Sequence, residues 1–251
     1  MLTVLSLGWG VQSFTLAAMS ALGDLPPLDY AVHADTGNEA SWTYAFAAKW
    51  TPWLEEHGVK VRTVRDETGQ RHPIDRWGGV MIPAHYPETA AFKAGYLKRQ
   101  CTDQWKRAPI RRFVHAQAKT ATMWIGISYD ESLRQKASDV KWLTHAHPLL
   151  DRRMRRSDCE HWLLTHGVSV PAKSSCYFCP FKRQSDWMFI KHAAPADWEK
   201  TLVVDEQIRT YKQTFTLYLH QSCKPLAVAT DESLGVQLNL IQDDCSGLCW
   251  T

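Results

Sequence analysis

The strongest chemical signal in the sequence is a pair of cysteines separated by two residues, Cys176 and Cys179. This spacing lets both thiolates reach one metal ion or cluster. With Cys101 and Cys159 upstream there are enough thiols to ligate zinc or a [4Fe–4S] cluster, and spacing alone does not choose between the two. A redox-active dithiol is a third interpretation of the pair. The remaining interpretation is that both are ordinary buried thiols that only fill space in the core.

A second signal is a glycine-rich turn between a strand-like run, Leu2–Ser6, and a helical pattern. Glycines let the backbone approach an anion closely, and the unpaired N–H groups of a helix's first turn point at it. Such turns also occur without a ligand. We expect a phosphate or sulfate site formed by Ser6, Gly8, Gly10, Val11, Gln12 and Ser13.

Polar residues also follow two later strand-like runs, at 30–34 and 123–128. Those after the first run are Asp35, Thr36 and Gly37, and those after the second include Gly126 and Arg134. With a nucleotide bound, the carboxylate would hold Mg²⁺ or a ribose hydroxyl, whereas without one it would serve as a helix cap. An arginine at the second position can clamp a phosphate or sulfate bidentately.

Charge and the end of the chain suggest partners. The net charge is only +3, but basic residues cluster within 93–112 and within 152–156. Each cluster is either a solvated face or a positive field for nucleic acid or a phosphorylated nucleotide. Cys245 and Cys249 lie in the tail, where a mobile cysteine can swing into an active site.

The elements that must position these residues alternate between strand and helix in the first half of the chain. Strands are expected at 2–6, 30–34, 59–64 and 123–128, and helices at 13–22, 40–57 and 104–117, with 66–94 irregular. Such an alternation predicts right-handed crossovers and a parallel, Rossmann-like α/β sheet, which binds ligands at the carboxyl ends of its strands. We expect a nucleotide-binding core over 1–150 and a helical, cysteine-bearing region over 151–251, with helices at 157–166, 184–193 and 197–214.

Composition narrows the class of protein. A chain of 251 residues with 45% hydrophobic and 22% charged residues is typical of a soluble globular domain, with or without an appended lobe. No apolar run is long enough to cross a bilayer, and no leader precedes the first strand. Seven cysteines then favour metal or redox chemistry over a disulfide framework. We expect a cytoplasmic protein.

Together these motifs resemble the adenine-nucleotide alpha-hydrolase (PP-loop) superfamily, in its branch of PAPS and APS reductase-like proteins. The turn at 6–13 is similar to a Ser-Gly-Gly-x-Asp-Ser pyrophosphate loop, with Gln12 at the position of Asp. The other matches are Asp35-Thr36-Gly37, Cys101 with Lys106 and Pro109, Gly126-Ile127-Ser128 with Glu131 and Arg134, and Cys176 with Cys179.

The resemblance implies an ATP-pyrophosphatase-type enzyme that binds ATP or another adenine nucleotide, with Mg²⁺, and adenylates an acceptor for sulfur transfer. Arg134 would stabilise charge in the reaction. It also implies a [4Fe–4S] cluster, with zinc as the alternative, on Cys101, Cys159, Cys176 and Cys179. The acceptor would be DNA or tRNA, and a partner protein would donate sulfur. One alternative is a sulfonucleotide reductase that uses Cys245, and another is a non-catalytic, zinc-containing nucleic-acid-binding protein.

Overall fold

The computed structural model describes residues 1–67, 72–74, 79–211 and 216–231. The chain divides into two compact units. The α/β unit contains the described residues within 1–69 and 104–174, and the second unit those within 70–103 and 175–231. The sequence-based division after residue 150 groups the residues differently, because the segment 70–103 packs with residues that follow 174.

A five-stranded sheet forms the centre of the α/β unit, in the order β3-β2-β1-β6-β7. All neighbouring strands are parallel, so the predicted parallel α/β class is confirmed. The strands are β1 (Leu2–Ser6), β2 (Tyr30–Ala34), β3 (Val61–Val64), β6 (Ala121–Trp124) and β7 (Leu143–Ala146). The last of these was not predicted, because four residues ending in His145 and Ala146 carry little strand pattern.

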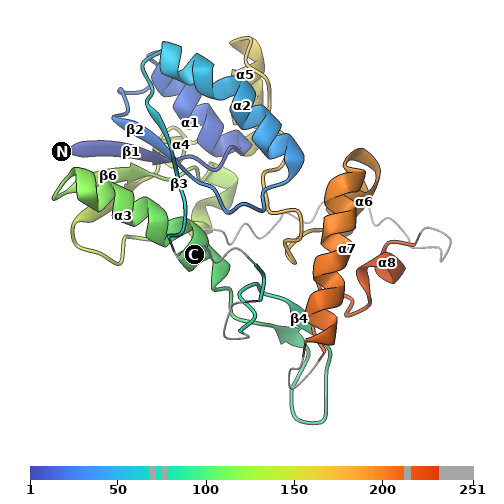
Figure 1. Ribbon diagram of the computed structural model, residues 1–251. Coiled ribbons are helices and arrows are strands. Elements are labelled where there is room, and N and C mark those ends of the chain that lie inside the picture. Colours follow the sequence, from blue (N-terminus) through green and yellow to red (C-terminus); the bar gives the residue numbers. More distant parts are fainter. Residues whose placement is uncertain (68–71, 75–78, 212–215, 232–251) are drawn as a thin grey trace. The chain divides into compact units, whose positions relative to one another are not determined.

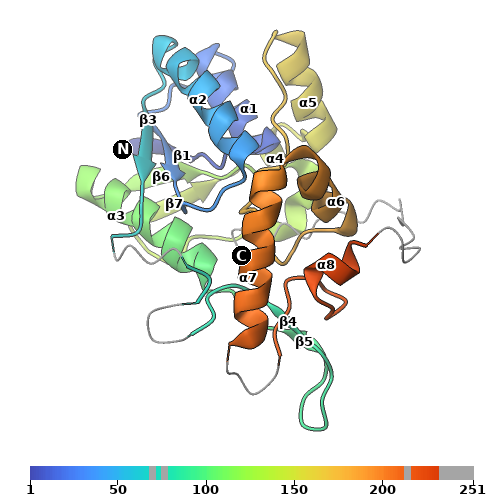
Figure 2. The same cartoon turned by 45° about the vertical axis from the view of Figure 1, so that its right-hand side comes forward.

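Helices cover both faces of this sheet (Figures 1 and 2). On one face lie α1 (Val11–Ala21), α2 (Ser41–Glu56) and α5 (Arg156–Thr165), and on the other lies α3 (Ala108–Gln117); α4 (Pro148–Asp151) is a single turn. Neighbouring residues of β1 face opposite sides, as the pleat requires. Leu5 accordingly packs in the core beneath α1, and Val4 in the core with Ile110 of α3.

Local signals explain how these helices begin. Pro109 lies in the first turn of α3 and does not break it, because a proline there loses no helical hydrogen bond. A π-helical segment, η1 (Thr102–Arg107), precedes it. α5 begins one residue earlier than expected: the Arg155 N–H donates to the Asp158 carboxylate at 2.8 Å, so Asp158 stabilises the first turn from inside the helix.

The second unit contains a hairpin and helices. The hairpin is formed by β4 (His85–Tyr86), within the stretch 66–94 that was expected to be irregular, and β5 (Gly95–Tyr96), directly after that stretch. Two residues per strand are too few to show a period-2 pattern. The helices are α6 (Gln184–Ala193), α7 (Pro195–Thr210) and α8 (Leu226–Ala229). Among the described helices, none combines the length and apolar character that a bilayer crossing requires.

Candidate functional site

The glycine-rich turn connects β1, the middle strand of the sheet, to the N-terminus of α1. Gly10 is the N-cap of α1 and supplies no side-chain cap, and the first turn contains no acidic residue. The Ser13 hydroxyl closes the turn on itself: it accepts from the Gly8 N–H at 3.1 Å and donates to the Gly10 carbonyl at 3.3 Å. The partial positive charge of the helix end is therefore left for an anion.

Trp9 gives this turn its shape. Its φ of 56° is left-handed, a conformation that favours glycine, yet the residue is a tryptophan with only 2% of its surface exposed. The indole packs against the rings of Phe14 and Phe46, with centroid separations of 6.0 and 6.3 Å. Core packing thus compensates for the backbone strain and fixes the turn at the end of β1.

Gly126, after β6, lies against the first turn of α1. A Cβ at this position would be 2.8 Å from the Ser13 nitrogen and 3.0 Å from its Cα. Both are backbone atoms, so only glycine allows this approach. The structure therefore joins two of the segments predicted to bind nucleotide, at the carboxyl ends of adjacent parallel strands.

Gln12 connects the turn to two more segments. Its amide Nε2 donates to Ser128 Oγ at 3.4 Å and to Glu131 Oε2 at 3.3 Å. Its Oε1 accepts from Arg156 Nη1 at 3.4 Å. Arg156, which lies 144 residues downstream of Gln12, was not predicted as a site residue, because nothing in the local sequence pairs the two.

Glu131 and Arg134 form an ion pair of 2.6 Å on the short 3₁₀ segment η2 (Tyr129–Arg134). Burial raises the pKa of the Glu131 carboxyl above its ordinary value, even though the Arg134 guanidinium acts in the opposite direction. The Nε of Arg134 is buried without a hydrogen-bond partner among the described residues.

Asp35 is already well satisfied at the end of β2. Its carboxylate accepts from the Tyr44 hydroxyl at 2.7 Å, from the Gly37 N–H at 2.8 Å and from Arg65 Nε at 2.8 Å. Burial alone would raise the pKa of Asp35, but these bonds and the Arg65 charge outweigh it and the pKa is lowered. These contacts add a structural role to Asp35, whereas a nucleotide contact by Asp35, Thr36 or Gly37 stays a prediction.

Beside this carboxylate lies a buried ion pair between Glu39, the second acidic residue after the strand-like run at 30–34, and Lys106; the pairing itself was not predicted. Glu39 is 4% exposed, and its Oε1 accepts from Lys106 Nζ at 3.1 Å and from the Thr36 hydroxyl at 3.2 Å. Burial alone would raise the pKa of Glu39, but the charges of Lys106 and His33 lower it. Burial also lowers the pKa of His33, whose Nδ1 lies 3.1 Å from the Leu7 carbonyl. The sequence singled out each residue separately, Glu39 by its place after a strand-like run and Lys106 by its motif, but gave no sign that they pair.

Cys159 lies in the hydrophobic core of the α/β unit. It is on α5, fully buried in a cluster that includes Phe14 and Leu163. Burial raises the pKa of its thiol to about 12, which disfavours the thiolate that binds metals.

Cys101, Cys176 and Cys179 belong to the second unit. The Cys179 N–H donates to the Cys176 carbonyl at 3.1 Å, so the pair occupies a tight turn. Lys182, 6% exposed, extends from the end of this turn to Ser175 Oγ at 2.5 Å.

A [4Fe–4S] cluster or a structural zinc requires three or four ligands within reach of one centre. In the described part of the chain, no group of three or more His, Cys, Asp or Glu side chains is arranged to hold a metal ion. The described cysteines therefore do not form a complete cluster or zinc site, and a metal role for them stays a prediction. Cys245 lies outside the described residues.

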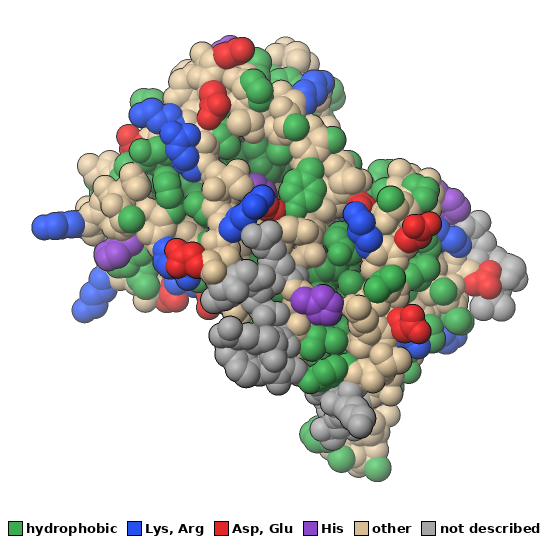
Figure 3. Space-filling view, in the orientation of Figure 1, with side chains coloured by type: hydrophobic (Ala, Val, Ile, Leu, Met, Phe, Trp, Pro, Cys, Tyr) green, Lys and Arg blue, Asp and Glu red, His purple; other side chains and the backbone are tan. Residues whose placement is uncertain are grey.

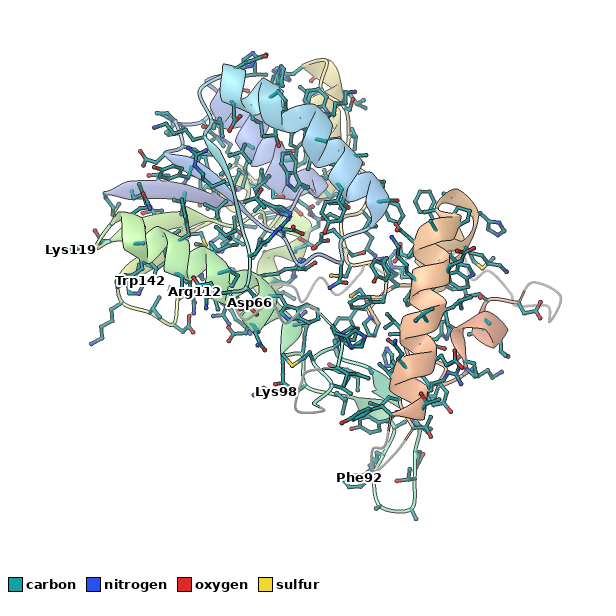
Figure 4. All side chains as sticks on the ribbon, viewed as in Figure 1. Asp66, Phe92, Lys98, Arg112, Lys119 and Trp142 are labelled. Carbon is teal, nitrogen blue, oxygen red and sulfur yellow. The ribbon has the colours of Figure 1, made fainter. Side chains whose placement is uncertain are left out.

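Three arginines of the first basic cluster form ion pairs with carboxylates outside the cluster. Arg107 and Arg111 both pair with Asp139, and Arg112 pairs with Asp66 at 3.5 Å (Figure 4). On the face of the α/β unit seen in Figure 3, Lys and Arg side chains are scattered among Asp and Glu rather than gathered into one patch.

A surface hollow of about 410 Å³ lies at the amino ends of β1 and β6, the sheet edge opposite to the glycine-rich turn.

Comparison with solved structures gives 16 matching chains. No protein-family model matches the chain, and no curated protein matches it. One similar solved structure is phosphoadenylyl-sulfate (PAPS) reductase from Candida auris, a phosphate complex, with a TM-score of 0.42, 8% identity, and coverage of 68% of this chain and 75% of that one. Another is the U34-tRNA thiolase NcsA from Methanococcus maripaludis with its [4Fe–4S] cluster, with a TM-score of 0.46, 12% identity, and coverage of 84% and 74%. Neither similarity transfers a residue or a ligand to this chain.

Proposed function

We propose that this protein binds the phosphate groups of an adenine nucleotide at the N-terminus of α1 and adenylates an acceptor. The observation that carries the proposal is the set of contacts at the uncapped first turn of α1: Gly126 packs on its backbone, and Gln12 bonds to Arg156 and to Glu131, the ion-pair partner of Arg134. Backbone N–H groups would bind the anion, and the guanidinium groups of Arg134 and Arg156, paired in this structure with Glu131 and Glu160, would contribute positive charge. Adenine as the base rests on the family resemblance of the motifs.

The reaction would begin with an acceptor oxygen attacking the α-phosphorus of ATP. The new P–O bond forms as the bond to the leaving pyrophosphate breaks, and the acceptor gives up its proton. A sulfide ion then displaces AMP, which leaves with the acceptor oxygen, so that sulfur replaces that oxygen. If a donor protein delivers the sulfur as a persulfide, its outer sulfur displaces AMP and a second thiol must then cleave the resulting S–S bond, forming a disulfide with the donor. The N–H groups of α1 and the Arg134 guanidinium would stabilise the charge that develops on the phosphate oxygens, which is where most of the barrier reduction arises.

Pyrophosphate release from ATP, measured with and without DNA or tRNA, tests this activity directly. Wild-type protein is expected to release pyrophosphate only with a suitable acceptor, and Arg134→Ala is expected to reduce the rate, by about 10²–10³-fold for loss of one donor to the developing charge. Absence of release under anaerobic conditions with every acceptor would refute adenylation, although nucleotide binding by the turn would remain open to a separate titration.

A second candidate, a sulfonucleotide reductase, is favoured by the side chain of Gln12. An amide binds divalent metals less well than a carboxylate, and Gln12 is already bonded to Arg156 and Glu131. Such a turn suits an anion that needs no Mg²⁺. A thiolate of Cys245 would attack the sulfur of APS or PAPS, giving a thiosulfonate on the protein and releasing AMP or adenosine 3′,5′-bisphosphate.

Calorimetric titration separates the two candidates. Adenylation requires ATP to bind more tightly with Mg²⁺ than with EDTA, whereas the reductase requires tight binding of APS or PAPS in EDTA. Cys245→Ser would abolish sulfite production in the second case only. Metal analysis after anaerobic purification then tests the proposed cluster or zinc, and full metal content in Cys176→Ser would exclude that cysteine as a ligand.

A further inference from the structure

The β4–β5 hairpin is anchored at its base. His85 and Tyr218 exchange two backbone hydrogen bonds of 2.8 Å, and the Leu97 N–H donates to the Ala84 carbonyl at 2.9 Å. At β5, Gly95 leaves room for the Tyr86 ring, whose hydroxyl would be 2.8 Å from a Cβ there. The hairpin is thus a fixed support for the loop that it carries (Figures 2 and 4).

The loop at its tip is ordered and displays an aromatic side chain. Thr89 N–H donates to the Phe92 carbonyl at 2.8 Å, and the Phe92 N–H donates to the Thr89 hydroxyl at 3.1 Å. Nevertheless, Phe92 is 48% exposed and lies at the outer end of the loop (Figure 4). Tyr96 is 52% exposed, with its ring held edge-on against Phe181 at 5.4 Å. About half of the surface of each residue is therefore exposed to solvent.

Two lysines flank these rings. Lys93 follows Phe92 in the chain. Lys98 comes two residues after Tyr96, and the alternation of an extended chain places these two side chains on the same side. Both lysines are exposed, and neither forms an ion pair with a described residue. Between residues 87 and 98 the only carboxylate is that of Glu88. An exposed surface with alternating rings and unneutralised ammonium groups is complementary to a flexible polyanion that carries flat bases.

We propose that this hairpin surface, defined by Phe92, Lys93, Tyr96 and Lys98, binds single-stranded nucleic acid. Bases would stack on the two rings, and phosphates would contact the two lysines. The six residue-to-residue steps from Phe92 to Lys98 span at most about 20 Å at 3.3 Å per step, the length of up to about six nucleotides at 3.4 Å each. Where the acceptor is a nucleic acid, this surface deepens the proposed function by holding that acceptor; the binding itself does not depend on adenylation.

Fluorescence anisotropy with labelled 12-nucleotide single-stranded DNA and RNA, and with a 12-base-pair duplex, tests the inference. Wild-type protein is expected to bind a single strand more tightly than the duplex at 50 mM salt. Phe92→Ala and Tyr96→Ala should each weaken binding about 5- to 150-fold, as for loss of one stacked base. Lys93→Ala and Lys98→Ala should each reduce the slope of log K against log salt by about 0.7. The DNA and RNA arms identify which strand is preferred.

The matched controls are Phe189→Ala and Lys119→Ala, which remove an exposed ring and an exposed lysine elsewhere. Both should bind like wild type, and thermal melting should show that all variants fold. Equal affinity of Phe92→Ala and Phe189→Ala would overturn the inference, as would absence of single-strand binding by wild type. So would a dimer in solution that Phe92→Ala dissociates. The affinity of the same variants for ATP should equal that of wild type. A defect of the nucleotide site would therefore be recognised separately from a defect of the hairpin surface.

Discussion

Removal of the Lys106 ammonium is expected to destabilise the protein through Glu39. The two charged groups are 3.1 Å apart, and at an effective dielectric constant of about 20 their attraction amounts to about 5 kcal/mol. The Lys106 side chain is 25% exposed, so solvent screens part of this energy. We therefore expect Lys106→Met to lower the free energy of unfolding by about 3 kcal/mol at pH 7, the low end for breaking a buried pair.

The pH dependence distinguishes this cause from simple loss of packing. In wild type the pKa of Glu39 is lowered from 4.5, so its stabilising contribution is present above pH 4.5 and is lost as the pH falls through the lowered pKa. In Lys106→Met, burial dominates and raises this pKa above 4.5, so ionisation of Glu39 reduces stability as the pH rises. The deficit relative to wild type should therefore shrink between pH 7 and pH 4.

Urea unfolding at several pH values between 4 and 7 measures both effects. The double variant Glu39→Gln with Lys106→Met supplies the control, because it removes both charges and should recover much of the loss at pH 7. A deficit for Lys106→Met that is below 1 kcal/mol, or that is the same at pH 4 and pH 7, would refute the reasoning.

Three further predictions concern the α/β unit. Gly126→Ala should lower the free energy of unfolding by about 1–3 kcal/mol and weaken nucleotide binding in a titration, because the new Cβ would meet the backbone of α1. Gly8→Ala is the control: its Cβ would be 3.8 Å from the nearest atom, so it should unfold at nearly the wild-type urea concentration. Cys159, fully buried, should resist iodoacetamide at pH 8 until the protein unfolds, as mass spectrometry would show; rapid native labelling would contradict its place in the core. Arg156→Ala should weaken nucleotide binding about tenfold or more in calorimetry, and equal weakening by Arg153→Ala, an exposed neighbour, would show that only net charge matters.

Local patterns predicted the framework of the site. The runs at 2–6 and 30–34 are strands with the predicted bounds, and the turn after each lies at a carboxyl end of the parallel sheet. Alternation of strand and helix was enough for this, because a parallel pair requires a crossover and the crossover brings successive carboxyl ends to one edge. The Cys-x-x-Cys spacing indicated that the two thiols lie close together in the chain, and the structure adds a turn closed by the hydrogen bond between Cys176 and Cys179.

Only the tertiary structure decided what faces the glycine-rich turn. The contacts of Gln12 with Arg156, of Gly126 with the first turn of α1, and of Glu39 with Lys106 join residues that are far apart in the chain. Nothing in a local window records such pairs, because they depend on strand order and on the packing of whole helices. The same holds for the burial of Cys159. The sequence of α5 is mostly polar, so which of its faces is buried becomes evident only when α1 packs against it. The sequence by itself therefore determined where an anion site could form, and the packing of distant segments determined its charge and its walls.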